Sequence, residues 1–240
     1  GTLTVSQSGT VTFDPEGDFD ELLLKDSKLT FDYEVTDNAA TSSHTDKSTL
    51  TINISAVNDA IEDGDESFST TENRQITNSN SANVLSNATD IDTGDTKHVS
   101  VDGTALTGSE SESYDGDKGG SFTLTADGAM TFDPGTDFDK LQAGATTDTS
   151  FEYQVTDGDS TDTSKVTVKI TGVNDAPNAV DDGTTFTVAG TTSTKAFEVI
   201  VDDTDVDGGT ISLTGLTTIN STFGNFAKTT DNKDVEYTFY

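Results

Sequence analysis

The feature that most constrains this chain is an internal repeat. The sequence Thr-Phe-Asp-Pro occurs at residues 12–15 and again at residues 131–134. The sequence Val-Asn-Asp-Ala occurs at residues 57–60 and again at residues 173–176. The spacing between matched blocks changes by only a few residues, which loops would absorb. Repetition of this kind indicates one structural unit that is used several times in series.

A third copy begins after Asp175. The sequence Thr-Asp-Ile-Asp-Thr-Gly at residues 89–94 matches Thr-Asp-Val-Asp-Gly-Gly at residues 204–209. One unit of about 116 residues has the size of a β-sandwich domain. The predicted division is the C-terminal half of a repeat, a complete β-sandwich repeat and the N-terminal half of a further repeat, over residues 1–58, 59–175 and 176–240.

Two explanations are open for the half-repeats. Either the chain is an excerpt of a longer tandem array, or half-repeats of neighbouring chains complete each other by strand addition or swapping. A clean swap would leave surplus strands, because residues 224–239 repeat the region that residues 1–13 also supply. We therefore favour the excerpt.

Within the repeats, apolar residues alternate with polar ones, as at Phe31, Tyr33 and Val35. This period of two predicts strands with one buried and one solvated face, which is typical of antiparallel sheets. Hydrophobic residues make up only 30 % of the chain, which leans toward disorder, but a disordered chain has no reason to alternate. The predicted fold class is all-β: tandem immunoglobulin-like or cadherin-like antiparallel β-sandwiches.

A short turn follows each Asp-Pro pair. It carries two apolar residues three positions apart, Phe19 and Leu22 in one copy and Phe138 and Leu141 in the other. We expect these side chains to close one end of the sandwich.

The charge of the chain limits its partners. It has 44 Asp and Glu against 12 Lys and Arg, a net charge of −32. This excludes nucleic-acid binding, because little could neutralise phosphates, and it disfavours anionic lipid surfaces. No apolar run is long enough for membrane insertion, and without cysteine neither disulfides nor cysteine-rich zinc sites are available. The expected partners are cations, adjacent repeats of the same chain and neighbouring copies in a filament.

One acidic turn has the spacing of a calcium loop. Asp203, Asp205 and Asp207 form the pattern D-x-D-x-D-G, with which calcium loops open. The twelfth position is Thr214 rather than an acid. The pattern therefore predicts a calcium-binding turn between strands rather than an EF-hand.

The middle repeat has a related turn. It keeps Asp90 and Asp92, but Ala88 stands in the place of Asp203. Asp95 is the candidate replacement ligand. The alternative is that this copy binds no ion.

A second group of acids lies at the predicted junctions between repeats. We expect the loop after one strand to meet the exit of the repeat at one pole, so that several oxygens converge on Ca²⁺. At the downstream junction the candidates are Asp157, Asp159, Asn174, Asp175, Asp181 and Asp182. At the upstream junction they are Asp37, Asn58, Asp59, Asp63, Asp65 and Glu72. Asp and Asn are also ordinary turn formers, so solvated turns without an ion are the alternative.

Signs of catalysis are poor, and the chain is not expected to be an enzyme. His44 and His98 fall in unrelated parts of different repeats. The motifs G-x-S-x-G and H-E-x-x-H are absent. Carboxylate pairs can hydrolyse glycosides, but here the acids lie on turns and the chain has no Trp for a sugar platform.

The repeated blocks resemble the cadherin-like, VCBS-type repeats of large bacterial type I-secreted (RTX-like) adhesins and biofilm-associated surface proteins. In that family a tyrosine strand is followed by V-T-D-G, and the repeat ends in I-T-G-V-N-D-A-P. Here these blocks are residues 153–158 and residues 170–177. The resemblance implies a cadherin-like or immunoglobulin-like sandwich, Ca²⁺ at turns and junctions, and an extracellular place on the bacterial surface or in a secreted matrix.

The sequence departs from this pattern at three positions. Ile61 replaces the linker proline, Asn38 replaces the glycine after Asp37, and Gly190 stands near where Glu72 would align. The two junctions are therefore not expected to be equivalent.

The function that we expect is a calcium-stiffened structural repeat, acting as spacer or filament body in an adhesin or biofilm fibre. One alternative is a glycan- or protein-binding module of a cell-surface adhesin, for which residues 108–120 would be the best candidate surface. Another is an accessory region of a secreted hydrolase.

Overall fold

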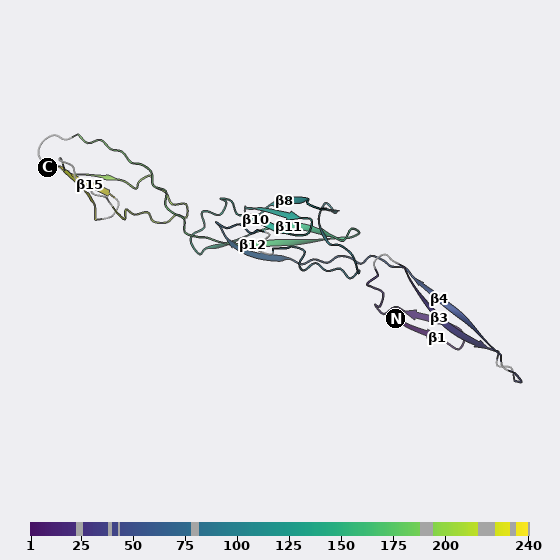
Figure 1. Ribbon diagram of the computed structural model, residues 1–240. Helices are drawn as coiled ribbons and strands as arrows, with labels where there is room; N and C mark the ends of the chain where they lie inside the picture. Colours follow the sequence, from purple (N-terminus) through teal and green to yellow (C-terminus); the bar gives the residue numbers. More distant parts are fainter. Residues whose placement is uncertain are drawn as a thin grey trace.

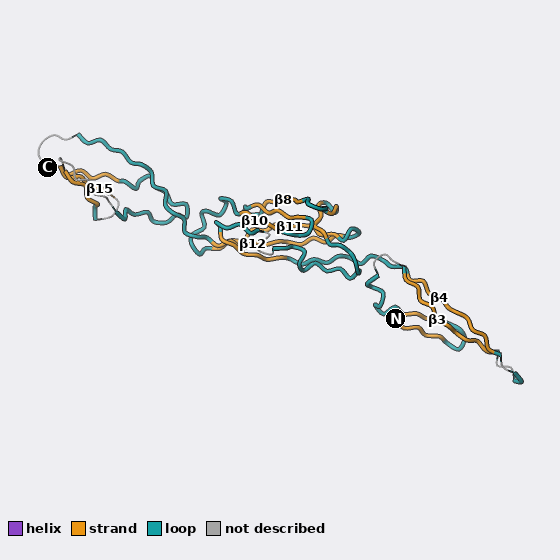
Figure 2. Tube along the Cα trace, in the orientation of Figure 1, coloured by secondary structure: helices purple, strands orange, loops and turns teal. Residues whose placement is uncertain are grey.

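The protein is all-β, as its alternating sequence predicts. The computed structural model describes residues 1–22, 26–37, 40–42, 44–77, 82–187, 194–215, 224–230 and 234–239. These residues form strands joined by turns and loops, and none of them is helical (Figure 2). The strands gather in three groups that follow one another along an elongated molecule (Figure 1). Within the described ranges, no helix is long and apolar enough to cross a membrane.

The first group consists of two antiparallel hairpins. Its strands are β1 (Thr2–Val5), β2 (Val11–Asp14), β3 (Ser27–Thr36) and β4 (Thr45–Ile54). Strands β3 and β4 form a sheet of their own, whereas the corresponding strands of the second group lie in a five-stranded sheet. The predicted alternation is present, but Tyr33 and Val35 stay 46 % and 55 % exposed because fewer neighbours cover them.

The second group is a sandwich of two sheets. Its strands are β5 (Glu66–Thr71), β6 (His98–Val101), β7 (Thr104–Ala105), β8 (Ser111–Asp115), β9 (Ser121–Thr125), β10 (Met130–Asp133), β11 (Thr146–Thr156) and β12 (Thr161–Thr171). One sheet has the order β5-β12-β11-β6-β7 and the other has the order β10-β9-β8. All pairs are antiparallel except β5 with β12, which run parallel with Phe68 opposite Val168.

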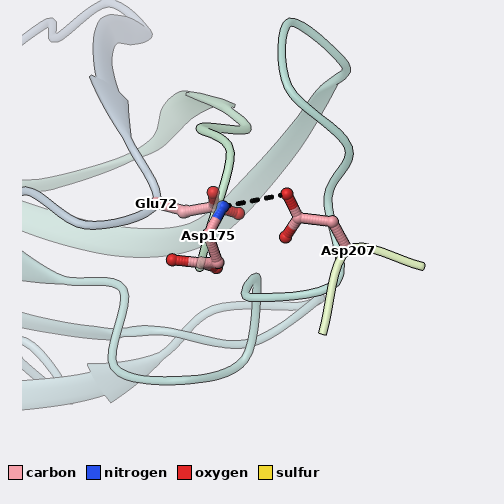
Figure 3. Close-up of side chains that lie close together, drawn as sticks. All are labelled: Glu72, Asp175 and Asp207. Atoms are coloured by element: carbon pink, nitrogen blue, oxygen red, sulfur yellow. Dashed lines mark hydrogen bonds between the residues drawn. The ribbon is translucent and has the colours of Figure 1, made fainter. Parts of the chain in front are cut away.

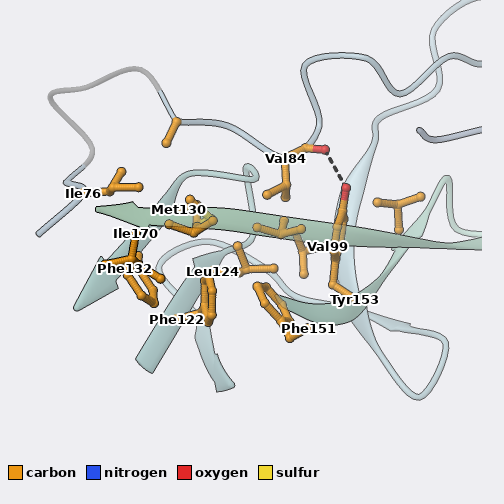
Figure 4. Close-up of a cluster of buried hydrophobic side chains, with 14 of the residues drawn as sticks. Ile76, Val84, Val99, Phe122, Leu124, Met130, Phe132, Phe151, Tyr153 and Ile170 are labelled. Carbon is orange, nitrogen blue, oxygen red and sulfur yellow. Dashed lines mark hydrogen bonds between the residues drawn. The ribbon is translucent and has the colours of Figure 1, made fainter. Parts of the chain in front are cut away.

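The hydrophobic core lies between these two sheets (Figure 4). Phe122 of β9 and Phe151 of β11 face each other across it, with ring centroids 4.5 Å apart. Phe138 is 4 % exposed, and Leu141 packs against the same core. As expected, the turn after Pro134 therefore closes one end of the sandwich. In the first group Phe19, the counterpart of Phe138, makes an edge-on contact with Phe13, at 5.8 Å between centroids.

The third group is a three-stranded antiparallel sheet in the order β13-β15-β14. Its strands are β13 (Thr194–Glu198), β14 (Gly224–Lys228) and β15 (Asp234–Phe239). Asn178, before β13, pairs with Thr204, after β13, just as Glu62, before β5, pairs with Thr89, after β5. The repeated sequence thus produces a repeated backbone pairing. Asn38 and Gly190, two of the departures from the repeat pattern, lie outside the described residues.

The direction of the β11–β12 hairpin decides where the acidic loops lie. Thr156 pairs with Thr161 at one end, and Thr146 pairs with Thr171 at the other. Residues that follow β11 and residues that follow β12 are therefore separated by the length of the hairpin, roughly 30 Å at about 3.4 Å per residue.

Candidate metal centres at the two junctions

The downstream acidic cluster consists of Glu72, Asp175 and Asp207 (Figure 3). Each residue offers a carboxylate oxygen within 4.8 Å of the others. Glu72 follows β5 and Asp175 follows β12, so both belong to the sandwich. Asp207 comes from the acidic turn between β13 and β14 of the third group of strands. The cluster therefore joins two successive parts of the chain.

Backbone hydrogen bonds hold one oxygen of two of these carboxylates. Asp207 Oδ2 accepts a hydrogen bond from the backbone N–H of Asp175 at 3.1 Å. Glu72 Oε1 accepts one from the N–H of Val173 at 2.5 Å. The turn itself is fixed by Asp205, whose Oδ1 accepts from the N–H of Asp207 at 3.0 Å. The second oxygens, Glu72 Oε2 and Asp207 Oδ1, are buried and have no hydrogen-bond partner.

In this geometry two of the three carboxyl groups are largely shielded from water. Glu72 is 1 % exposed and Asp207 is 9 % exposed. Burial raises the pKa of Glu72, the N–H of Val173 opposes this only in part, and the charges of Asp175, Asp207 and Asp139 raise it further. Buried carboxylates need a compensating charge or a proton. The cluster is therefore suited to hold a cation.

The upstream cluster consists of Asp90, Asp92 and Asp95, again with carboxylate oxygens within 4.8 Å of one another. Its hydrogen bonds repeat those of the downstream cluster. Asp90 Oδ1 accepts from the N–H of Asp92 at 2.9 Å, and Asp92 Oδ2 accepts from the N–H of Asp59 at 2.8 Å. Asp90 Oδ2, Asp92 Oδ1 and Asp95 Oδ2 are buried without a partner. The replacement of the first aspartate by Ala88 therefore leaves an acidic cluster in place.

Asn58 and Asp157 extend this upstream cluster. The Asn58 side-chain N–H donates to Asp157 Oδ2 at 3.4 Å, while Asn58 Oδ1 is buried without a partner. Burial raises the pKa of Asp95, and the charges of Asp90, Asp92, Asp157 and Asp159 add to this. Burial also acts to raise the pKa of Asp157, but hydrogen bonds from Ser160 and Asp159 outweigh it and lower the value to about 2. Asp157 is therefore an anion at neutral pH.

The first group of strands touches this cluster through its backbone. The N–H of Thr93, in the acidic turn, donates to the carbonyl oxygen of Glu21 at 3.2 Å. Glu21 belongs to the turn that follows Pro15. Like the downstream cluster, the upstream one therefore lies where two parts of the chain meet.

The structure regroups several of the expected ligands. The sequence grouped Asp157 and Asp159 with Asn174 and Asp175, and this grouping is wrong. Asp157 follows β11 whereas Asn174 follows β12, so the two lie at opposite ends of an antiparallel hairpin. Asn174 instead donates to the carbonyl oxygen of Asp175 at 2.6 Å.

Asp37 and Glu72 are regrouped for related reasons. Asp37 follows β3, at the end of the β3–β4 hairpin opposite to Asn58, and its Oδ1 accepts from the N–H of His44 at 3.0 Å. The sequence predicts Glu72 at the upstream junction, which is wrong because β5 runs parallel to β12 and carries Glu72 to the downstream end. Neither residue lies with Asn58.

Asp63 and Asp65 lie outside both clusters. Asp63 Oδ2 accepts from the hydroxyl of Tyr153 at 2.7 Å, and Asp65 Oδ1 accepts from the N–H of Lys165 in the middle of β12 at 3.0 Å. Both acids lie against the sandwich rather than at a junction.

Asp203, Asp181 and Asp182 form a separate acidic patch. Asp203 Oδ1 accepts from the N–H of Val180 at 2.8 Å. Desolvation raises the pKa of Asp182, and the charges of Asp202, Asp203 and Asp181 add to this. Asp203 therefore lies outside the downstream cluster, unlike Asp207, although both belong to the D-x-D-x-D pattern.

Sequence reasoning missed Asp139, whose charge acts on Glu72. It lies in the turn after Pro134, in the repeated Asp-Phe-Asp block. The repeated block is the sequence signal for this residue, but the apolar residues of the same turn indicate only a role in the core.

Both clusters offer carboxylate oxygens, and the upstream one adds the amide oxygen of Asn58. Such oxygen donors suit hard cations such as Ca²⁺, which takes six to eight oxygens, rather than metals that prefer nitrogen or sulfur. The buried oxygens without partners show that the residues fit such an ion.

Comparison with known proteins finds one family model that matches the central part of the chain. Residues 58–172 match the family described as bacterial cadherin-like domain. No curated protein matches the sequence.

Several solved structures are similar over nearly the whole chain. The extracellular cadherin domains 1–5 of protocadherin gamma B2 share 15 % identity over 100 % of this chain and 43 % of that chain, with a TM-score of 0.47. The extracellular domain of protocadherin gamma B4 shares 17 % identity over 98 % of this chain and 38 % of that one, with a TM-score of 0.43. An endo-fucoidan hydrolase of glycoside hydrolase family 107 shares 14 % identity over 99 % of this chain and 32 % of that one, with a TM-score of 0.32. This chain spans less than half the length of each of them.

Proposed function

We propose that this chain, whose residues 58–172 match the bacterial cadherin-like domain family, is a structural spacer stiffened by Ca²⁺ at its junctions. One observation carries the proposal. At each junction, acidic side chains converge and leave carboxylate oxygens that are buried without any hydrogen-bond partner. A divalent cation would satisfy these oxygens and neutralise their charge.

The placement of the ligands explains how an ion would stiffen the chain. Downstream, Glu72 and Asp175 lie on the sandwich side and Asp207 lies on the other side. An ion bound by all three would hold the two parts at a fixed angle. Without it, like charges about 4 Å apart repel by roughly 1–4 kcal/mol, depending on the local dielectric.

The proposed role is mechanical, and it assigns no catalysis to the chain. As part of an adhesin or biofilm fibre on the bacterial surface or in a secreted matrix, the repeats would hold other domains at a distance. Extracellular modules typically bind Ca²⁺ with Kd of about 10⁻⁴–10⁻³ M. A site in this affinity range would be filled only where Ca²⁺ is plentiful, so the proposed role requires an extracellular location.

The test is thermal unfolding together with small-angle X-ray scattering, in excess Ca²⁺ and in chelator. We expect Ca²⁺ to raise Tm by mass action, since the folded site binds the ion and the unfolded chain does not. We also expect scattering to change from that of a flexible chain to that of a stiff rod. NaCl at matched ionic strength controls for screening. Identical curves with Ca²⁺ and with chelator would mean that the carboxylates are only a solvated acidic surface.

A further inference from the structure

A second arrangement of buried acids lies inside the sandwich, away from both junction clusters. It consists of Asp63, Glu66 and Tyr153. Glu66, the first residue of β5, is 7 % exposed, and Tyr153 of β11 is 2 % exposed. The Tyr153 hydroxyl contacts Asp63 Oδ2 at 2.7 Å, the Val84 carbonyl oxygen at 3.0 Å (Figure 4) and Glu66 Oε2.

These contacts need more hydrogens than the tyrosine carries. A phenol has one hydrogen, and it can donate to only one of the three oxygens around it. Two oxygens that both lack a hydrogen repel at such distances. A proton on a carboxyl group would remove the conflict: Glu66 would donate to the tyrosine oxygen, and the tyrosine would donate to Asp63 or to Val84. The carboxyl oxygens Asp63 Oδ1 and Glu66 Oε1 are buried without partners.

The charged groups around Asp63 and Glu66 are also acidic. Asp63 and Asp65 act on Glu66, and Asp162 acts on Asp63. Burial raises the pKa of Glu66 to about 7, hydrogen bonds from Tyr153 and Asn87 oppose this in part, and the charges of Asp63 and Asp65 add to the rise. Burial likewise raises the pKa of Tyr153 far above its ordinary value, so the phenol keeps its hydrogen.

We propose that Asp63, Glu66 and Tyr153 form a proton-binding site in the core of the sandwich, with the proton held on Glu66. The site goes beyond the junction ions, because it lies among residues that belong to neither cluster and needs no metal. Its effect on stability has a definite sign. Glu66 binds its proton more tightly in the folded chain than in the unfolded one, so the stabilisation is complete below the unfolded pKa and is lost as pH rises through about 7.

The direct test is a carboxyl-carbon NMR titration of the uniformly ¹³C-labelled full chain, once in chelator and once in excess Ca²⁺. We expect Glu66 to titrate near pH 7 in both. Titration near the ordinary glutamate value would overturn the proposal. A midpoint that falls when Ca²⁺ is added would also overturn it, because Glu66 would then be a metal ligand. The chelator arm stays informative even if the junctions bind no Ca²⁺.

Thermal unfolding between pH 5 and pH 8 in chelator gives an independent test. Glu66→Gln keeps a neutral side chain of similar shape, and Glu152→Gln removes an exposed acid next to Tyr153 on the same strand. We expect Tm to fall with pH in the wild type and in Glu152→Gln, and to fall less in Glu66→Gln. Equal slopes in all three would overturn the proposal. If Glu66→Gln does not fold, the NMR titration of the wild type still tests the proposal, because the Glu66 carboxyl resonance is assigned by through-bond experiments and needs no variant.

Discussion

At the scale of single residues, both clusters contain a carboxylate with one oxygen fixed by the chain and one left over. Asp207 receives the N–H of Asp175 on Oδ2, and Asp92 receives the N–H of Asp59 on Oδ2. In both, Oδ1 is buried without a partner. The hydrogen bond to the fixed oxygen orients the carboxylate in advance, so little conformational entropy is lost when an ion binds. The free oxygen is the one that an ion would bind.

Replacing this carboxylate should weaken Ca²⁺ binding. We expect Asp207→Asn to lower the affinity of the downstream site about tenfold or more, equivalent to roughly 1.4 kcal/mol, because ligand charge count sets Ca²⁺ affinity. Isothermal titration calorimetry on the full chain measures this. Asp202→Asn, an exposed acid near the same turn, is the matched control. Equal losses in both variants would point to general charge reduction rather than to a ligand.

The tyrosine inside the sandwich should be stabilising through its hydroxyl. Tyr153→Phe removes the hydroxyl that lies between the oxygens of Asp63, Glu66 and Val84, and we expect a loss of about 1–3 kcal/mol in the free energy of unfolding. The loss should be larger at pH 8 than at pH 5, since an ionised Glu66 depends more on a donor. Chemical denaturation measures it. Tyr114→Phe, half-buried on β8, is the control. A loss no greater than that of the control would mean that the Tyr153 hydroxyl does not stabilise the fold.

At the scale of elements, the sequence predicts strands well and their pairing partly. The alternation of apolar residues located β3, β4, β11 and β12, because one buried face forces a period of two. The hairpin direction that separates Asp157 from Asn174 was also implied, since only a short loop joins β11 to β12. The parallel pairing of β5 with β12 left no local pattern, because it joins segments far apart in the chain. That pairing puts Glu72 beside Asp175, so the downstream cluster could not be assembled from sequence alone.

The tight turn before β9 should be intolerant of a side chain. Gly120 has φ of +75°, and an added Cβ would lie 2.5 Å from the ring of Phe132. We expect Gly120→Ala to cost about 1–3 kcal/mol of stability, from backbone strain together with the clash. Gly135 has a φ of +57° with nothing within 4 Å of an added Cβ, so Gly135→Ala measures strain alone. Similar denaturation midpoints for the two variants would mean that the Phe132 contact adds nothing.

At the scale of the whole molecule, charge and shape act together. A net charge of −32 makes the parts of the chain repel one another, but salt at 0.15 M screens exposed charges beyond about 8 Å. Salt therefore weakens the long-range repulsion and leaves the buried oxygens of the junctions unsatisfied. A bound ion acts only at its own junction, whereas salt screens exposed charges along the whole chain. Experiments can therefore separate ion binding from screening.

The two junctions should accordingly stiffen the molecule independently. The upstream and downstream clusters lie at opposite ends of the sandwich, and distant sites contribute additively. In excess Ca²⁺, we expect Asp92→Asn to loosen only the upstream junction and Asp207→Asn only the downstream one. Because the chain has no cysteine, introduced pairs can be labelled cleanly for single-molecule energy transfer. Ser8→Cys with Ser111→Cys spans the upstream junction, and Ser111→Cys with Thr230→Cys spans the downstream one.

Each aspartate variant should broaden the distance distribution of its own pair and leave the other pair as narrow as in the wild type. Chelator should broaden both, whereas matched NaCl should not reproduce the narrowing that Ca²⁺ causes. If either variant broadens both pairs, the junctions are coupled through the sandwich, and its packed core, rather than a local ion, transmits the stiffness. If neither variant broadens its own pair, the carboxylates do not set the angle between the parts, and the stiffness must come from the linking backbone itself.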